Sequence, residues 1–179
     1  MIILTDGSVD PQSQLGFGAY LAIPGLGLSL TELQTRIKIR RFEQTSSTQL
    51  ELQTVIWALH DQPQSADKLT FYSDSQNIIG LLDRRRRLER NDYRAKNGKR
   101  LKHAELYQEF FRLTDQRPCE FIKLQGHQTS RHKNAIDQLF TLVDRASRKA
   151  LRDQLSTSLA PRKKPSSTIR STIDTCNIG

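Results

Sequence analysis

The chain has 179 residues, which allows one ordinary domain and a tail, and its 28 Lys and Arg against 19 Asp and Glu give a formal net charge of +9. No uncharged apolar run of about 18 residues occurs, which excludes a transmembrane helix, and Asp6 interrupts the N-terminal apolar run too early for a secretory signal. Two cysteines and four scattered histidines exclude a disulfide framework and a zinc signature. We expect a cytoplasmic protein with no membrane partner and no obligate protein partner.

Hydrophobic periodicity divides the chain into strands and helices in a mixed order. The expected strands are residues 1–6, 16–23, 36–40, 68–73 and 120–124, and the expected helices are residues 46–60, 75–82, 104–113 and 133–152. Short connections between the first three strands indicate an antiparallel meander. The order predicts an α/β fold, a mixed sheet with helices on both faces. Residues 1–152 would form the domain, and residues 153–179 a flexible basic tail.

The positive charge is concentrated in residues 83–103. This segment holds ten Lys and Arg and three Asp and Glu, so its net charge is ten minus three, or +7. Such a block favours a polyanionic partner, above all nucleic acid. A solvated basic helix face would have the same composition, so composition alone leaves both interpretations open.

Three carboxylates stand where a metal site at a sheet edge would need them. Asp6 follows the apolar run of the first strand, Asp74 follows the fourth strand, and Glu51 interrupts an apolar helical window. If the first and fourth strands are neighbours, Asp6 and Asp74 meet at one edge, and a buried Glu51 is costly unless it is paired or binds a metal. Two Mg²⁺ ions about 4 Å apart could then clamp the attacking and leaving oxygens of a phosphodiester. Taken singly, the three could also be a turn residue, a helix cap and a surface residue.

An ordered set of short motifs carries a family resemblance. The motifs are Thr5-Asp6-Gly7-Ser8 followed by Gly16-Phe17-Gly18-Ala19, then Leu50-Glu51-Leu52, Ser73-Asp74-Ser75-Gln76, Gly126-His127 and an Asp on the last helix. With this order and spacing, the chain resembles a type 1 ribonuclease H from Met1 to about Arg152. The resemblance implies a five-stranded mixed sheet whose first three strands are antiparallel. It also implies endonucleolytic, two-metal hydrolysis of the RNA strand of RNA–DNA hybrids with Mg²⁺, with Mn²⁺ as the alternative ion.

The resemblance further implies roles for individual residues. Asp6, Glu51 and Asp74 would be catalytic metal ligands, and His127 would be a mobile base or product-release residue. The alternative for His127 is a loop histidine with no role.

The fourth metal ligand is open between two residues of the last helix. Asp137 lies ten residues after His127, the usual family separation, and Asp144 lies seventeen after it. Asp144 is followed four residues later by Arg148, a pattern that resembles the family helix and favours Asp144 as the ligand. Two turns, or about 10 Å, separate the two carboxylates, so only one can reach the metals. The other is expected to pair with a base four residues away.

The basic segment resembles the helical handle that some family members insert before an amphipathic helix. Its cations would neutralise phosphates, which gives sequence-independent and salt-dependent affinity. The expected nucleic-acid contacts are Ser47, Thr48, Gln76, Arg84, Arg85, Arg86, Arg87, Arg90, Lys99 and Arg100. Residues 46–49 read Ser-Ser-Thr-Gln where the family often has Asn before the metal-binding Glu, so preference for hybrids is less secure than hydrolysis.

Two other functions remain open. A non-catalytic or weakly catalytic module of this fold would bind hybrids or duplexes through the same basic handle. A nuclease of the same fold could instead act on DNA, although the motifs around Asp6 and Asp74 favour a ribonuclease H.

Overall fold

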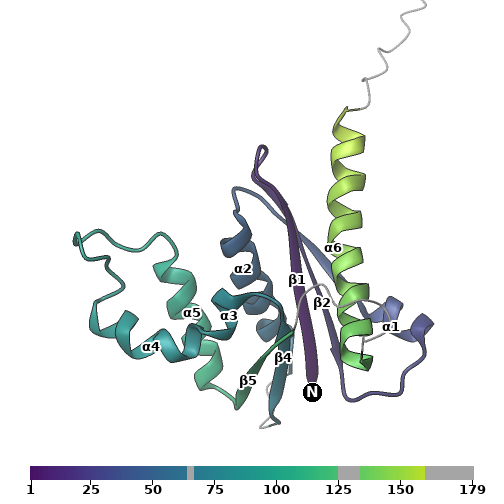
Figure 1. Cartoon of the computed structure of the whole chain (residues 1–179), viewed down its shortest axis with the longest axis horizontal. Coiled ribbons are helices and arrows are strands. Elements are labelled where there is room, and N and C mark those ends of the chain that lie inside the picture. The colour runs from purple at the N-terminus through teal and green to yellow at the C-terminus, as the bar shows by residue number, and fades with distance from the viewer. Residues whose placement is uncertain (64–66, 125–133, 160–179) are drawn as a thin grey trace, which may run out of the picture.

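The structure, a computed structural model, describes residues 1–63, 67–124 and 134–159. Its strands are β1 (Ile2–Asp10), β2 (Leu15–Ile23), β3 (Lys38–Phe42), β4 (Leu69–Ser73) and β5 (Cys119–Lys123). They form one mixed sheet in the spatial order β3-β2-β1-β4-β5 (Figure 1). β1, β2 and β3 pair antiparallel, whereas β4 pairs parallel with both β1 and β5. The expected five-stranded sheet and its antiparallel meander are confirmed.

Helices cover both faces of this sheet. They are α1 (Leu30–Arg36), α2 (Ser47–His60), α3 (Gln76–Ile79), α4 (Leu81–Arg90), α5 (Ala104–Asp115) and α6 (Ala135–Leu159). Figure 1 shows α2 to α5 on one side of β1 and α1 with α6 on the other. Of the helices that the structure describes, none combines the length and apolar character needed to cross a membrane.

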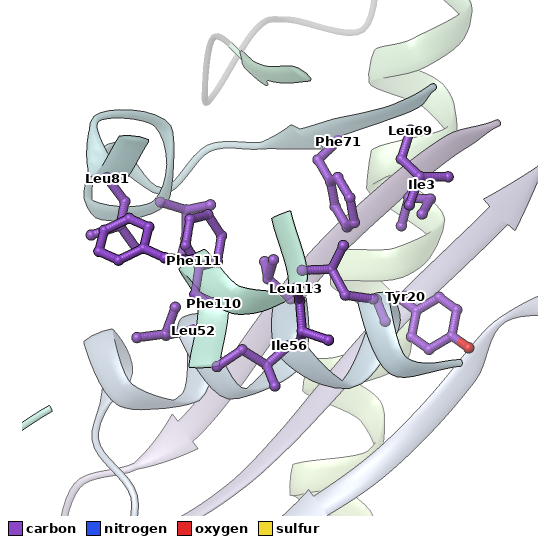
Figure 2. Packing of buried hydrophobic residues seen from close by; sticks show 14 of the residues in the cluster. Ile3, Tyr20, Leu52, Ile56, Leu69, Phe71, Leu81, Phe110, Phe111 and Leu113 are labelled. Carbon is purple, nitrogen blue, oxygen red and sulfur yellow. The ribbon is translucent and has the colours of Figure 1, made fainter. Parts of the chain in front are cut away.

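The alternation of side chains along β1 divides the core into two layers. Ile3 faces α2 and α5 and belongs to a cluster with Leu52, Phe71 and Phe110 (Figure 2). Leu4 faces the opposite way, into a cluster that contains Val143 of α6. Helices therefore approach β1 from both faces, which is what allows one site to draw residues from α2 and α6.

β1 extends well beyond its parallel neighbour β4. The two strands pair over three residues, ending with Leu4 opposite Tyr72, whereas β1 remains paired with β2 along its whole length. Asp6 and Asp74 each lie two residues past that last pair. The parallel register therefore places Asp6 and Asp74 side by side, where β1 continues past the end of β4.

Two glycines let α2 lie close against this part of the sheet. A Cβ on Gly7 of β1 would come within 2.9 Å of the Leu50 side chain, and a Cβ on Gly18 of β2 would collide with Thr54. Because neither glycine has a Cβ, the helix can approach the backbone of both strands. This close contact brings Glu51, the neighbour of Leu50, to the sheet edge.

Some elements differ from the sequence-based expectation near the N-terminus. β1 runs to Asp10, so Asp6 lies within the strand and not at its end, because pairing with β2 satisfies the backbone of residues 7–10. Residues 30–35 have no predicted element and residue 36 is expected to begin the third strand, but residues 30–36 form α1, which begins with a capping box between Ser29 and Glu32. This helix shifts the third strand from residues 36–40 to 38–42.

The later elements are longer or more divided than expected. The helix predicted at residues 75–82 is interrupted at Gly80, and its second part, α4, continues into the basic segment. α6 ends at Leu159 rather than 152, supported by an ion pair between Lys149 and Asp153 at 2.5 Å. Assigning residues 153–159 to a flexible tail was therefore wrong, and residues 160–179 lie outside the described part of the chain.

Candidate functional site

The acidic residues lie together where β1 extends past the end of β4. A small hollow at this point is lined by Thr5 and Asp6 of β1, Glu51 and Thr54 of α2, and Ser73 and Asp74 at the end of β4. Asp6 lies in a strand interior, Glu51 in a helix, and Asp74 directly after a strand. The three carboxylates predicted from the sequence are thus brought together from separate elements.

Asp6 is the most perturbed of these carboxylates. Its pKa is raised to about 6, chiefly by burial and also by the charges of Asp144 and Asp74, while a hydrogen bond from Ser147 opposes these effects. In that bond the Ser147 hydroxyl donates to Asp6 Oδ2 at 2.5 Å. Asp6 is therefore the group whose ionisation would gain most from a nearby cation.

Glu51 shows the same behaviour to a smaller degree. Burial and the charge of Asp74 raise the pKa of Glu51, while a hydrogen bond donated by the Ser75 hydroxyl lowers it. Ser75 also caps α3, since its oxygen accepts from the Ile78 amide. One serine thereby connects the first turn after β4 to the acidic residue of α2.

The structure separates the two candidates for the fourth carboxylate. Asp144 lies close enough to Asp6 to raise its pKa, and its own Oδ1 is 2.7 Å from Nε of Arg148. Asp137 instead belongs to the start of α6, where its Oδ2 accepts from the Asn134 amide at 3.1 Å and its amide donates to Asn134 Oδ1 at 2.9 Å. Asp137 thus has the geometry of a capping residue, and Asp144 that of a site residue.

The donor set fits a hard divalent cation, because all four groups are carboxylates and only Arg148, among the described residues, forms an ion pair with one of them. As the side chains stand, no three Asp, Glu, His or Cys of the described chain form a group that could hold a metal ion. Asp6 and Glu51 each accept a hydrogen bond from a serine hydroxyl, and Asp144 forms an ion pair with Arg148.

Comparison with known proteins decides the family. The RNase H family model matches residues 1–147. The chain belongs to the ribonuclease H family. It is 26% identical over 122 residues to Ribonuclease H of Chlorobaculum parvum, covering 66% of this chain and 83% of the relative. It is 28% identical over 99 residues to Ribonuclease H of Acetivibrio thermocellus, covering 54% of this chain and 67% of the relative.

The handle of this ribonuclease H family member begins on α4. Arg86, Arg87 and Arg90 are exposed on that helix and have no ion-pair partner among the described residues. Lys99 is also exposed, on the loop that follows, which turns at Gly98 with φ of 78°. Of the residues predicted to contact nucleic acid, these four form what we call the free part of the basic handle.

Other predicted handle residues form hydrogen bonds or ion pairs with the rest of the protein. Arg85 forms a two-pronged pair with Asp115 of α5, contacts Glu89 at 2.7 Å and lies over the Phe111 ring. Arg84 donates to the carbonyl oxygens of Gly80 and Asn77. Arg100 contacts Gln108 at 3.5 Å. The contacts give Arg85 in particular a role in holding α4 against α5.

The predicted polar contacts surround the entrance to the acidic site. Ser47 and Thr48 lie in the first turn of α2, and Gln76 opens α3. Asn77 Nδ2 donates to Thr48 Oγ1 at 3.4 Å, which connects the two helix starts. Ser47 and Gln76 are exposed. His127 lies outside the described residues.

Sequence reasoning missed Ser147. It is fully buried, and it lies three residues after Asp144, on the same helix. A buried hydroxyl one turn from a predicted metal ligand was the available signal, since Ser at a core-facing helix position needs a hydrogen-bond acceptor.

Proposed function

We propose that this ribonuclease H family member hydrolyses the RNA strand of RNA–DNA hybrids with divalent cations, Mg²⁺ or Mn²⁺. The observation that carries the proposal is the meeting of carboxylates from β1, α2 and the end of β4 around one hollow, with Asp144 of α6 close enough for its charge to act on Asp6. Burial raises the pKa of Asp6 to about 6, so a bound cation would stabilise the ionised cluster. The name Ribonuclease H of both curated relatives agrees with this activity.

In this proposal Asp6, Glu51, Asp74 and Asp144 hold the cations, and Asp137 does not. A pair of bound divalent ions supplies charge neutralisation for both the attacking and the leaving oxygen of a phosphodiester. Asp6 provides a fixed position, because β1 is paired on the β2 side and Ser147 holds one carboxylate oxygen. Glu51 must exchange its bond to Ser75 for the cation, and Asp144 its bond to Arg148.

His127 completes the proposed machinery as a proton carrier. An imidazole with an ordinary pKa near 6.5 can accept and release a proton at neutral pH. In the sequence His127 lies between β5 and α6, three residues after Leu124.

Substrate binding is assigned to the surface around this site. Arg86, Arg87, Arg90 and Lys99 would neutralise phosphates on one side, which gives affinity without sequence preference. The hydroxyl and amide groups of Ser47, Thr48 and Gln76 would contact sugar and phosphate at the entrance, including the 2′-hydroxyl that distinguishes RNA from DNA.

End-labelled RNA–DNA hybrid, RNA duplex and DNA duplex of one sequence test the proposal. With Mg²⁺ we expect cleavage of the RNA strand of the hybrid only, leaving 5′-phosphate and 3′-hydroxyl ends, and no product in EDTA. The Asp74→Asn variant should bind hybrid but not cleave it, whereas Asp83→Asn, on exposed α4, should cleave at the wild-type rate. Binding of hybrid without product would instead indicate a non-catalytic module, and product from DNA duplex would indicate a DNA nuclease.

A further inference from the structure

The C-terminal half of α6 carries a second basic surface, separate from the handle. From Asp144 to Leu159 the helix continues for fifteen residues, or about 22 Å at 1.5 Å per residue. Figure 1 shows this half of α6 rising beyond the sheet, on the opposite side of the molecule from α4. It therefore leads away from the acidic site in a direction that the handle does not cover.

Three arginines share one exposed face of this segment. Arg145, Arg148 and Arg152 are spaced at i, i+3 and i+7, which places them along one side of a helix over about 10 Å. All three are exposed, and the Arg148 side chain is 60% exposed even though it pairs with Asp144. We call these three residues the α6 arginine ridge.

The positive charges of the ridge are only partly neutralised by acidic residues of the described chain. Within the described part of the chain, Arg145 and Arg152 have no hydrogen-bond or ion-pair partner. The nearby carboxylate of Asp153 is already paired with Lys149 at 2.5 Å. The guanidinium groups of Arg145 and Arg152 are thus exposed without a partner among the described residues, and that of Arg148 is exposed beside Asp144.

The ridge is continuous with the acidic site through one residue. Arg148 contacts Asp144, which raises the pKa of Asp6 by its charge. When Asp144 binds another group, Arg148 loses this partner and becomes free to bind an anion. A guanidinium group matches a phosphate with two parallel hydrogen bonds, so the ridge fits a phosphodiester backbone better than a diffuse lysine surface would.

We propose that the α6 arginine ridge binds the phosphate backbone of the substrate on the side of the acidic site opposite the handle. The inference rests on the proposed function for the identity of the nucleic acid. The duplex would be held from both sides, by α4 and its loop on one and by α6 on the other. Each arginine that contacts a phosphate adds to the salt dependence of binding.

Equilibrium binding of labelled hybrid in EDTA, over a series of salt concentrations, tests the ridge without cleavage. For the double variant Arg145→Ala/Arg152→Ala we expect the slope of log affinity against log salt to fall by roughly 1.5 to 2, and hybrid affinity to fall roughly five- to tenfold at moderate salt. The matched control is Arg36→Ala, which removes an exposed arginine from α1, the helix that packs against the other end of α6. Its slope should equal that of the wild type.

The outcomes distinguish the ridge from the proposed activity. If the double variant, folded by its thermal melting curve, shows the same slope and affinity as Arg36→Ala, the ridge does not bind the substrate, whatever the wild type cleaves. If the slope falls while the wild type fails to cleave any hybrid, the proposed function is wrong and the ridge remains as a nucleic-acid surface. Rescue of the slope by Arg145→Lys/Arg152→Lys would assign the effect to charge.

Discussion

The acidic site and the basic handle represent two opposite ways of building a functional surface. The site collects Asp6, Glu51, Asp74 and Asp144 from elements spread over most of the chain, and burial shifts the pKa of Asp6 and Glu51 upward. The free part of the handle comes from one continuous segment and stays exposed. A cluster of like charges drawn from separate elements and partly buried can be assembled only by the fold, whereas an exposed basic surface needs only a helix and a loop.

This difference predicts that the two regions fail in different ways. Loss of a carboxylate should abolish the chemical step and leave substrate affinity almost intact. Loss of handle arginines should weaken binding and leave the rate at saturating substrate almost intact. The following predictions test that separation, from the largest expected effect to the smallest.

Asp144→Asn should reduce kcat by roughly a thousandfold or more, because an interaction used in the transition state is worth several kcal/mol. The matched control is Asp137→Asn on the same helix, which should keep its kcat and lose about 1 kcal/mol of unfolding free energy through the weakened capping box. Single-turnover cleavage and thermal melting measure the two effects. Loss of kcat in Asp137→Asn with kcat retained in Asp144→Asn would instead indicate that Asp137 is the fourth ligand.

The triple variant Arg86→Ala/Arg87→Ala/Arg90→Ala should lower the salt slope of hybrid binding by roughly 2 to 3, with KM rising and kcat retained. The reason is that these side chains are exposed and have no ion-pair partner among the described residues, so their charge is available to phosphates. Steady-state kinetics at several salt concentrations give both quantities. A fall in kcat with unchanged KM would show that the handle takes part in the chemical step.

Asp6→Asn should stabilise the metal-free protein at pH 7 by about 1–3 kcal/mol, since a folded-state pKa near 6 against 3.8 means that ionised Asp6 opposes folding. The sign follows from the raised pKa: this contribution favours the folded state below about pH 4 and is lost as the pH rises through 6. Urea unfolding in EDTA at pH 4.5 and pH 7 measures it. Equal variant effects at both pH values would contradict the burial of an ionised Asp6.

Arg85→Ala should lower the free energy of unfolding by about 1 kcal/mol and leave the salt slope of binding unchanged. Its guanidinium group is bound to Asp115 and Glu89 and lies over Phe111, so its removal loosens α4 from α5. Comparison with Arg87→Ala separates the roles, because the latter should change the slope and not the stability. A lower salt slope of hybrid binding for Arg85→Ala would instead show that Arg85 contacts the substrate.

The sequence was sufficient where local signals agree with the fold. Short connections between the first three strands predicted the antiparallel meander, and the apolar runs around Asp6, Glu51 and Asp74 predicted that these carboxylates meet if the first and fourth strands are neighbours. The extent of β1 could not be predicted, because residues 7–10 lack a continuous apolar run and are held in the strand by pairing with β2. The capping box of Ser29 with Glu32 was a readable signal for α1 that was not used.

The choice between Asp137 and Asp144 needed tertiary information. The Asn134 and Asp137 side chains bond to each other's backbone amides only once α6 begins there, and Asp144 reaches Asp6 only after α6 packs on β1. The role of Ser147 likewise depends on which helix face is buried. The extension of α6 to Leu159, and with it the length of the arginine ridge, depended on ion pairs and half-buried residues that periodicity alone did not reveal.

Direct measurement of divalent-cation binding tests the central claim, that four carboxylates distant in sequence act as one cation site. Mn²⁺ titrated into substrate-free protein at pH 8 and followed by electron paramagnetic resonance reports bound ion without any cleavage step. The account predicts saturable binding by the wild type and at least tenfold weaker binding by Asp6→Asn, with Asp137→Asn unchanged. Equal binding by folded Asp6→Asn and wild type would contradict it.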